Sequence, residues 1–249
     1  MASIKTVAEV DEVAATLRTR YHDFSHHNRR NPLDELLFIL CSIQTNEHNY
    51  RASYSSLRRR FAKFVDLHEA SAEGIADAIV MGGLARQKAA TIKGIMRALV
   101  QRFGRPTLTP LHRMSDDECE QVLTSLPGVG KKVARCVMVF SLGRDVFPVD
   151  TNCWRICRRL GWVRPTRRNG SCGPRDMDRL QAKIPLHLRF SLHVNMVSLG
   201  RDFCTPRNPR CDDCPLEPYC RQIQVRKARE HGTSGGTAYH VVGNGTHSS

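Results

Sequence analysis

The stretch from Leu126 to Lys132, Leu-Pro-Gly-Val-Gly-Lys-Lys, constrains the fold of this chain more than any other. Upstream of it, Ser115–Glu118 is a capping-box sequence, and apolar residues then recur at helical spacing as far as Leu126. The proline ends that helix, and both glycines permit a positive φ. A second helical periodicity resumes at once and ends at Gly143. The pattern predicts two helices joined by a tight hairpin.

A hairpin of this kind leaves backbone N–H groups unpaired at the start of its second helix, where the helix dipole also favours an anion. We therefore expect Gly128, Gly130 and Lys131 to contact a nucleic-acid phosphate. Turns of the form Gly-x-Gly are also common between helices that bind nothing. The hairpin by itself leaves both a phosphate site and a plain turn open.

The charge of the chain favours a polyanionic partner. Lys and Arg outnumber Asp and Glu by 38 to 24, which gives a formal net charge of +14, and the pI is about 9.7. Nucleic acid and an acidic membrane surface both fit such a charge. The longest strongly apolar run, residues 36–41, is too short to span a bilayer, and no secretory leader pattern is present. We expect a soluble intracellular protein, in the cytoplasm and nucleoid or in a eukaryotic nucleus, that does not bind membrane.

Helical periodicity dominates the rest of the chain, and no stretch alternates convincingly as a strand. The pattern predicts an all-α fold. Apart from the hairpin pair and a helix capped by Asp150, the expected helices cover about 7–20, 33–44, 48–63, 71–80, 86–103 and 176–199. Residues 226–249 are basic and then rich in Gly, Ser and Thr, which is typical of a disordered tail.

Four of the ten cysteines form a compact group near the end of the chain, Cys204, Cys211, Cys214 and Cys220, with the spacing Cys-x6-Cys-x2-Cys-x5-Cys. Four thiolates in seventeen residues indicate a metal centre, either tetrahedral zinc or an iron–sulfur cluster. Zinc ribbons usually have two Cys-x2-Cys pairs and this segment has one, so the spacing slightly favours iron–sulfur. The other six cysteines lie on helical periodicities and are expected to pack as small apolar residues.

Taken together, the hairpin, Val149–Thr151 eighteen residues later and the cysteine group resemble the endonuclease III family of helix-hairpin-helix (HhH-GPD) DNA glycosylases. The resemblance covers residues 30–222. It implies two α-helical domains with DNA in the groove between them and a [4Fe-4S] cluster on the four cysteines. By the same resemblance, residues 33–144 form the six-helix domain, and residues 1–32 with 145–225 form the cluster domain.

The resemblance also implies the catalytic residues of a bifunctional DNA glycosylase and abasic-site (AP) lyase. Lys132 matches the family's catalytic lysine, whose amine attacks C1′ of the sugar, and Asp150 matches its catalytic aspartate. The amine must be neutral to attack, and we expect burial and the helix dipole to lower its pKa. The plainer alternatives are that Lys132 binds a phosphate and that Asp150 caps the helix beginning at Thr151.

An enzyme that acts at C1′ within a duplex must take the nucleotide out of the base stack. Gln44 and Leu84 match the family's two loops that insert into the gap. Leu84 follows two glycines and precedes a basic flank, although a core leucine is the plainer interpretation. Arg86 and Lys88 in that flank are expected to contact phosphates.

The expected partner is double-stranded DNA that contains damaged bases or abasic sites, bound by a monomer. Oxidised or ring-saturated pyrimidines are the first substrate hypothesis. Residues 147–152 and 159–163 are also similar to plant 5-methylcytosine DNA glycosylases, so a modified or mismatched pyrimidine is the second. A non-catalytic DNA-binding module stays open as an alternative from another class, whereas an RNA partner is disfavoured because no aromatic stacking surface is evident.

Overall fold

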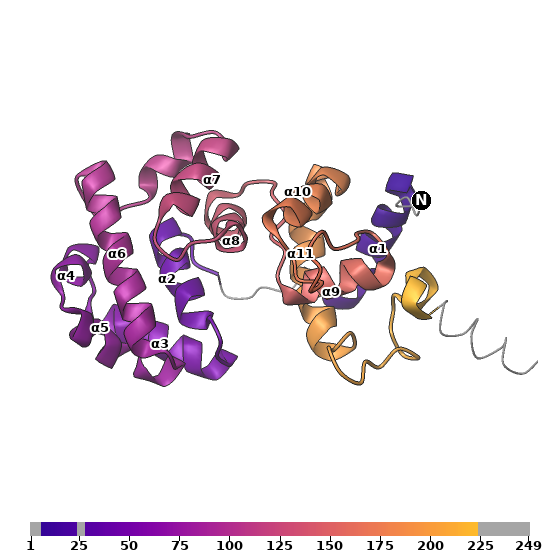
Figure 1. The fold of residues 1–249 in the computed structure, drawn as a ribbon, viewed down its shortest axis with the longest axis horizontal. Helices are drawn as coiled ribbons and strands as arrows, with labels where there is room; N and C mark the ends of the chain where they lie inside the picture. Colours follow the sequence, from indigo (N-terminus) through magenta and orange to yellow (C-terminus); the bar gives the residue numbers. More distant parts are fainter. Residues whose placement is uncertain (1–5, 24–27, 224–249) are drawn as a thin grey trace, which may run out of the picture.

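The computed structural model describes residues 6–23 and 28–223, and Figure 1 shows helices joined by loops over these residues. No strand occurs within the described ranges, so the predicted all-α fold is confirmed. The expected tail, residues 226–249, lies outside them. The helices are α1 (Thr6–Tyr21), α2 (Pro32–Ser42), α3 (Glu47–Arg60), α4 (Phe64–Glu69), α5 (Ala72–Ala78), α6 (Ala85–Phe103), α7 (Asp116–Ser125), α8 (Lys131–Leu142), α9 (Thr151–Leu160), α10 (Pro174–Lys183) and α11 (Arg189–Asp202), with short 3-10 turns η1 (Val80–Gly82), η2 (Thr109–Arg113), η3 (Leu186–Leu188) and η4 (Glu217–Tyr219).

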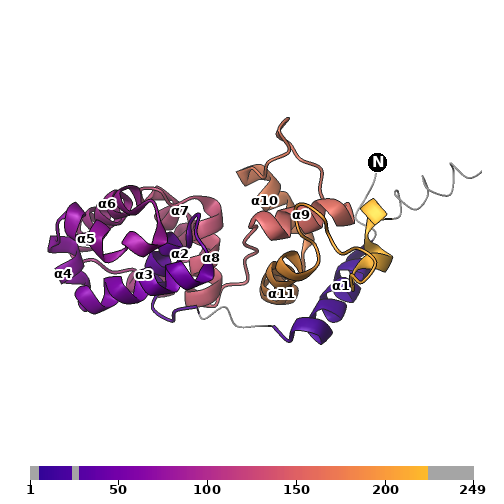
Figure 2. The ribbon, with the colours of Figure 1, turned by 90° about the horizontal axis from the view of Figure 1, so that it is seen from below.

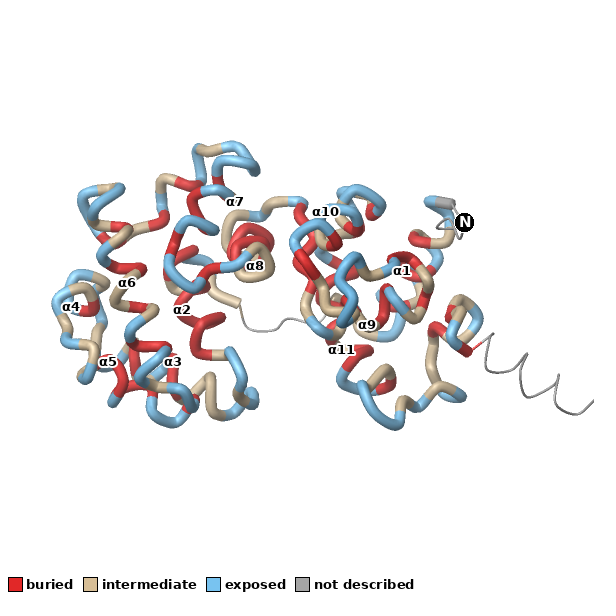
Figure 3. Tube along the Cα trace, viewed as in Figure 1, coloured by how far each residue is buried: buried red, intermediate tan, exposed pale blue. Residues whose placement is uncertain are grey.

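A first hydrophobic core is built by α2 to α8. The apolar α2 lies at its centre, in contact with α3 and α8, and is buried on nearly every side. Helix α8 joins α2 and α7, and α6 covers α4 and α5. The buried residues in Figure 3 gather along α2 and α8 accordingly. Helix α8, which follows the hairpin, therefore packs directly against the buried centre of this core.

A second core combines the N-terminal helix with the C-terminal part of the chain. Helices α1 and α9 both pack against α11, and the core extends from Val10 to Leu17 and again from Phe147 to Leu216. Both tryptophans, Trp154 and Trp162, are buried in it. Figure 2 shows the two bodies side by side, with α1 and the later helices on one side and α2 to α8 on the other.

Two expected helices are each divided in the structure. The helix expected over 48–63 ends at Arg60, and a separate short helix, α4, begins at Phe64. The helix expected over 176–199 is split into α10 and α11 at Pro185, because proline removes an N–H donor and clashes with the preceding turn. Both boundary predictions were therefore wrong.

The hairpin joins α7 to α8 much as the sequence predicts, with one difference at its second glycine. Ser115 and Glu118 form the predicted capping box, and Gly143 ends α8 in the left-handed region. Gly128 has φ +72°, but Gly130 is the extended N-cap of α8 with φ −89°. Only the first glycine therefore needs a conformation that other residues avoid.

No helix of the described residues is long and apolar enough to cross a lipid bilayer.

Candidate functional site

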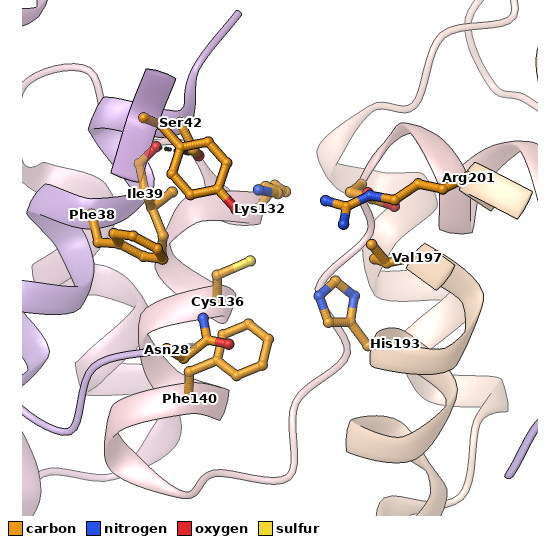
Figure 4. Close-up of a pocket in the computed structure, with 12 residues that line it drawn as sticks. Asn28, Phe38, Ile39, Ser42, Lys132, Cys136, Phe140, His193, Val197 and Arg201 are labelled. Carbon is orange, nitrogen blue, oxygen red and sulfur yellow. Dashed lines mark hydrogen bonds between the residues drawn. The ribbon is translucent and has the colours of Figure 1, made fainter. Parts of the chain in front are cut away.

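A cavity of about 130 Å³ lies between the two cores and is lined from both (Figure 4). Two helices present rows of residues at a spacing of four, which places each row on one helix face: Lys132, Cys136 and Phe140 on α8, and His193, Val197 and Arg201 on α11. The remaining lining residues are Asn28, Phe38, Ile39, Ser42, Tyr50 and Asp150. An amine, a thiol, a carboxylate and an imidazole thus share one cavity.

Lys132 is the basic group of this cavity. It lies in the first turn of α8, with Cys136 one turn further on and close enough to accept a hydrogen bond from the ammonium. Cys136 and the carboxylate of Asp150 hold the pKa of Lys132 above its ordinary value, against the burial that favours the neutral amine. The expectation of a lowered pKa was therefore wrong for the DNA-free protein.

Asp150 is the N-cap of α9, as its plainer interpretation predicts, and its Oδ1 accepts the backbone N–H of Cys153 at 2.7 Å. Although burial favours the neutral acid, His193, that N–H and Lys132 together lower the pKa of Asp150. The cap directs the carboxylate toward the cavity. The lysine and the aspartate are consequently an ammonium and a carboxylate at neutral pH.

A short chain of hydrogen bonds fixes the orientation of this carboxylate. Asn152 donates from Nδ2 to Asp150 Oδ2 at 3.0 Å, and its Oδ1 accepts from Arg155 at 2.7 Å. Arg155 also donates to the backbone carbonyl of Cys204 at 2.6 Å. A guanidinium can only donate, so Oδ1 of the amide must face it and Nδ2 must face the aspartate.

Lys131 precedes Lys132 in the sequence and points elsewhere. Its ammonium pairs with Glu120 of α7 at 3.0 Å and with Asp178 of α10 at 2.9 Å. Although burial opposes it, bonding to these two carboxylates raises the pKa of Lys131. The buried Arg135 bonds to the same two acids. In the DNA-free protein the Lys131 side chain is therefore engaged by two carboxylates, and its contact with a phosphate stays a prediction.

The hairpin itself keeps its expected open backbone. No side chain caps the N-terminus of α8, and both Gly128 and Gly130 are exposed. A Cβ atom at Gly130 would meet nothing within 4 Å, whereas one at Gly128 would come within 2.8 Å of Thr91. The N–H groups after Gly130 consequently face free space at a helix N-terminus, the arrangement that binds anions.

The two expected inserting residues lie on exposed turns. Gln44 has φ +50° and Leu84 has φ +52°, a region that residues with side chains rarely adopt. Leu84 is 46% exposed, which excludes the alternative of a core leucine. Gln44 follows Ser42, a residue of the cavity wall. Arg86 is exposed beside Leu84, as a phosphate contact would need to be.

Lys88 is buried, contrary to the expectation that it contacts DNA phosphate. Only 5% of it is exposed, and its Nζ donates to the backbone carbonyls of Cys41 and Gly82, each at 2.9 Å. An ammonium enclosed in this way has no free face for an external anion. The residue instead joins the ends of two helical segments.

Several cavity residues were missed by sequence reasoning. Cys136 was treated as a packing residue, although its position four residues after Lys132 already places both on one helix face. His193 lies far along the chain, with its Nδ1 at 3.0 Å from the carbonyl of Pro148. Asn28 is held at the cavity by the buried Glu35, to which it donates at 2.5 Å. Arg201 pairs with Glu47 at 3.4 Å, from one core to the other.

The four late cysteines suit an iron–sulfur cluster. Burial, with smaller contributions from the nearby thiols of Cys204, Cys220 and Cys211, raises the pKa of Cys214 to about 11. Across the described ranges, no three His, Cys, Asp or Glu side chains converge closely enough to hold a single metal ion. A cubane tolerates wider spacing, because each of its thiolates binds a different iron. Arg159 donates to the Sγ of Cys204 at 3.1 Å, a contact that suits a thiolate ligand.

Comparisons with known proteins agree with this geometry. Residues 38–171 match the profile of the HhH-GPD superfamily of base excision DNA repair proteins, and residues 204–220 match the iron–sulfur binding domain of endonuclease III. An Arabidopsis thaliana protein named as a DNA glycosylase is 32% identical over 229 residues, covering 86% of this chain and 74% of that protein. Endonuclease III of Thermotoga maritima is 31% identical over 218 residues, covering 87% and 94%.

A solved structure has the same fold. A non-covalent complex of endonuclease III with DNA superposes with a TM-score of 0.75 at 24% identity, covering 90% of this chain and 100% of that one. The cysteine segment lies within the matched iron–sulfur domain, so the predicted [4Fe-4S] cofactor is confirmed.

Proposed function

Because the chain belongs to the HhH-GPD superfamily of base excision DNA repair proteins, we propose that it is a bifunctional DNA glycosylase and AP lyase for damaged pyrimidines in duplex DNA. Its membership and its similarity to endonuclease III make it a DNA glycosylase with a [4Fe-4S] cluster. The observation that carries the finer proposal is the cavity, because Lys132 and Asp150 both line it while Lys131 is paired with two acids outside it.

The chemistry follows from these two groups. The neutral amine of Lys132 attacks C1′, the new C–N bond forms, and the base leaves with the electron pair of the glycosidic bond. Asp150 stabilises the positive charge that develops on the sugar and accepts the proton from the attacking nitrogen. Ring opening gives a Schiff base, and loss of a C2′ proton then expels the 3′ phosphate by β-elimination. One residue thus serves both the glycosylase and the lyase step.

The size of the cavity supports a pyrimidine substrate. A cavity of about 130 Å³ is close to the engineered cavity of about 150 Å³ that binds benzene in another protein. The cavity, which opens to solvent, therefore has room for one six-membered ring. Phe38, Tyr50 and Phe140 supply aromatic faces for stacking, and the amide of Asn28 supplies a polar contact.

The proposed DNA contacts lie on the first core. The open N–H groups of the hairpin at Gly128 and Gly130 would hold one phosphate, and Arg86 another. Gln44 and Leu84 would fill the gap left by the extruded nucleotide. The division into residues 33–144 and residues 1–32 with 145–225 is our proposal for the domains, and the two separate cores support it. We propose that a monomer binds the DNA, because one chain supplies both walls of the cavity.

A modified or mismatched pyrimidine is the second candidate substrate. Cys136, Val197 and Phe140 form an apolar part of the cavity wall that suits a methyl group on the base. The sequence similarity of residues 147–152 and 159–163 to plant 5-methylcytosine glycosylases also favours this second candidate. A panel of duplexes carrying oxidised pyrimidines, thymine opposite guanine, or 5-methylcytosine separates the two candidates by which base is released.

The proposed chemistry is tested by borohydride trapping on duplexes that contain an abasic site or a pyrimidine lesion. The wild-type chain is expected to form a covalent adduct, since borohydride reduces the Schiff base. Lys132→Gln is expected to form none. Lys131→Gln is the matched control, with the same substitution one residue earlier. It is expected to form the adduct, because the amine that it removes is directed to Glu120 and Asp178 and not to the cavity.

Two outcomes contradict the proposal. Adduct formation by Lys132→Gln at the wild-type rate would assign the nucleophile to another amine. Binding of every duplex by the wild-type chain without adduct or base release would instead support a non-catalytic DNA-binding module.

A further inference from the structure

Lys88 is a buried cation for which the proposed chemistry has no use. It lies in the first turns of α6, and both of its acceptors are backbone carbonyls rather than carboxylates. Burial lowers the pKa of this lysine. A buried charge without an opposite charge nearby is unfavourable unless it is hydrogen-bonded. The two hydrogen bonds of Lys88 to backbone carbonyls are therefore what stabilises its buried ammonium.

The two acceptors are backbone carbonyls at the C-terminal ends of two helical segments. Cys41 lies in the last turn of α2, and Gly82 is the last residue of η1. Carbonyls at a helix C-terminus lack intrahelical partners and carry the negative end of the helix dipole. One ammonium therefore caps both segments, which are about forty residues apart in the sequence.

The two segments are also packed tightly where Lys88 joins them. A Cβ on Gly82 would lie 2.8 Å from the Oγ of Ser53 and 3.6 Å from the carbonyl oxygen of Cys41. Ser53 in turn donates to the carbonyl of Ile79 at 3.3 Å. A side chain at position 82 would have to displace Ser53, so η1 is packed closely against α3 and lies beside the end of α2.

Each capped segment leads at once into one of the exposed left-handed turns. Gln44 comes three residues after Cys41, and Leu84 comes two residues after Gly82. Both turns hold a side-chain-bearing residue at positive φ, a conformation that needs support from its surroundings. The support that the two turns share is the ammonium of Lys88.

We propose that Lys88 is a positioning residue that fixes the Gln44 turn and the Leu84 turn as one unit, so that both side chains enter the DNA together. This inference rests on the proposed function. Lys88 touches neither the DNA nor the reacting atoms. Its contribution is to nucleotide extrusion from the duplex and not to the reaction at C1′.

The test compares one abasic site in two contexts. Borohydride trapping is measured on a duplex and on the same abasic strand without its complement, where no nucleotide has to be extruded. Lys88→Met keeps a similar side-chain length and removes both donors. We expect duplex trapping to slow by about tenfold or more, as loss of charge-assisted hydrogen bonds would give, and single-strand trapping to change by less than about twofold.

Helix α6 offers a matched control in Lys93. Its Nζ likewise donates to two backbone carbonyls, those of His68 and of Ala70, the latter at 2.7 Å, but these lie at the end of α4, away from both turns. Lys93→Met removes the same kind of contact from the same helix. It is expected to trap both substrates at nearly the wild-type rate, whatever it costs in thermal stability.

A double substitution tests whether Lys88 acts through the turns. Leu84→Ala removes an inserting side chain and is expected to slow duplex trapping alone. If Lys88 acts by holding that turn, Lys88→Met combined with Leu84→Ala is hardly slower than the slower single variant. Independent effects would multiply instead, and multiplication would overturn the inference. Lys88→Arg, which can still donate to both carbonyls, is expected to restore most of the duplex rate.

The outcomes separate this inference from the proposed function. A wild-type chain that traps neither substrate refutes the proposed function itself. A wild-type chain that traps both, together with Lys88→Met trapping the duplex at the wild-type rate, refutes only the role of Lys88. Equal loss on duplex and single strand would also refute it, because the lysine would then serve the fold as a whole.

Discussion

Lys131 and Lys132 carry the same side chain at neighbouring positions and have different surroundings. The 100° turn of a helix between consecutive residues directs the first toward Glu120 and Asp178 and the second toward the cavity. Lys131 is neutralised by acids on both sides. Lys132 meets one acid, Asp150, and one thiol, Cys136, in a site with room for a substrate.

The protonation of Lys132 should govern the pH dependence of trapping. Its pKa lies above the ordinary lysine value, and only the neutral amine attacks, so the rate is expected to rise with pH throughout the neutral range. Burial raises the pKa of Cys136 to about 11, so at neutral pH this residue is an uncharged thiol that stabilises the ammonium of Lys132 by accepting a hydrogen bond. Cys136→Ala is therefore expected to shift the pH–rate profile toward lower pH, as measured by borohydride trapping at a series of pH values.

Cys136→Ser is the control for this shift, because a hydroxyl also accepts a hydrogen bond from the ammonium. It should keep the profile closer to that of the wild type. A profile for Cys136→Ala that coincides with the wild type, or moves to higher pH, would contradict the assignment of the thiol as the group that stabilises the charged amine.

At the scale of the element, the two glycines of the hairpin have different roles. Gly128 serves the fold, because its φ of +72° and the approach of Thr91 exclude a side chain. Gly130 is extended and has open space where a Cβ would be. The fold therefore does not require a glycine at position 130. A phosphate that binds the N–H groups after Gly130 would require one, because a side chain would stand in its way.

Gly130→Ala is expected to keep the fold and lose affinity for DNA. The extended backbone accepts alanine, but alanine is a poorer N-cap than glycine, so the free energy of unfolding should fall by no more than about 1 kcal/mol. Its affinity for a duplex, measured by fluorescence anisotropy, should fall about tenfold because the methyl group displaces a charge-assisted phosphate contact.

Gly128→Ala supplies the opposite pattern. Alanine in the left-handed region costs about 1 kcal/mol or more, so thermal denaturation should show a clear loss of stability. Unchanged DNA affinity in a fully folded Gly130→Ala variant would exclude the hairpin N–H groups from phosphate binding.

At the scale of the whole molecule, the site exists only because two cores meet. α8 contributes one wall and α11 the other, and α11 also anchors α9, which carries Asp150 at its N-terminus. The cluster loop follows α11 directly and is bonded to α9 through Arg155 and Arg159. Order in the cluster loop and the position of the Asp150 carboxylate, the proposed catalytic acid group, thus depend on the same core.

Loss of a cluster ligand should therefore disturb the second core selectively. Cys204→Ala is expected to lower the iron content well below the four per chain of a [4Fe-4S] cluster. Since Trp154 and Trp162 both lie in the second core, tryptophan fluorescence should shift with it. Circular dichroism should retain the helical signal of the first core.

Cys172→Ser is the comparison for this experiment, because Cys172 lies against the second core and outside the cysteine loop. It should keep both the iron content and the fluorescence of the wild type. Four irons per chain in Cys204→Ala with unchanged fluorescence would remove Cys204 from the ligand set.

Several features could be predicted because they depend on neighbours in the chain. The capping box of α7, the Asp150 cap of α9 and the left-handed glycine at position 128 all follow from residues within one or two turns. The four-cysteine segment was recognisable for the same reason. Local spacing decides these features, and local spacing is visible in a sequence.

The environments of the lysines could not be predicted in this way. Lys88, Lys131 and Arg86 all occur in basic stretches, and only Arg86 remains free of the partners that the other two have. One acceptor of Lys88, the carbonyl of Cys41, and one acceptor of Lys131, the carboxylate of Asp178, each lie 47 residues away in the sequence. A basic residue's role depends on what the fold brings beside it, which no periodicity encodes.

The sequence by itself determined the helical class, the hairpin, the cysteine centre and the pair of Lys132 and Asp150 as chemical candidates, since each is a local pattern or a motif match. Only the tertiary structure decided that Lys132 is charged before DNA arrives, that Lys131 and Lys88 are engaged within the protein, and that Cys136 and His193 share the cavity. The physical reason is that burial, ion pairing and pKa depend on distances in space, and residues far apart in the chain set those distances.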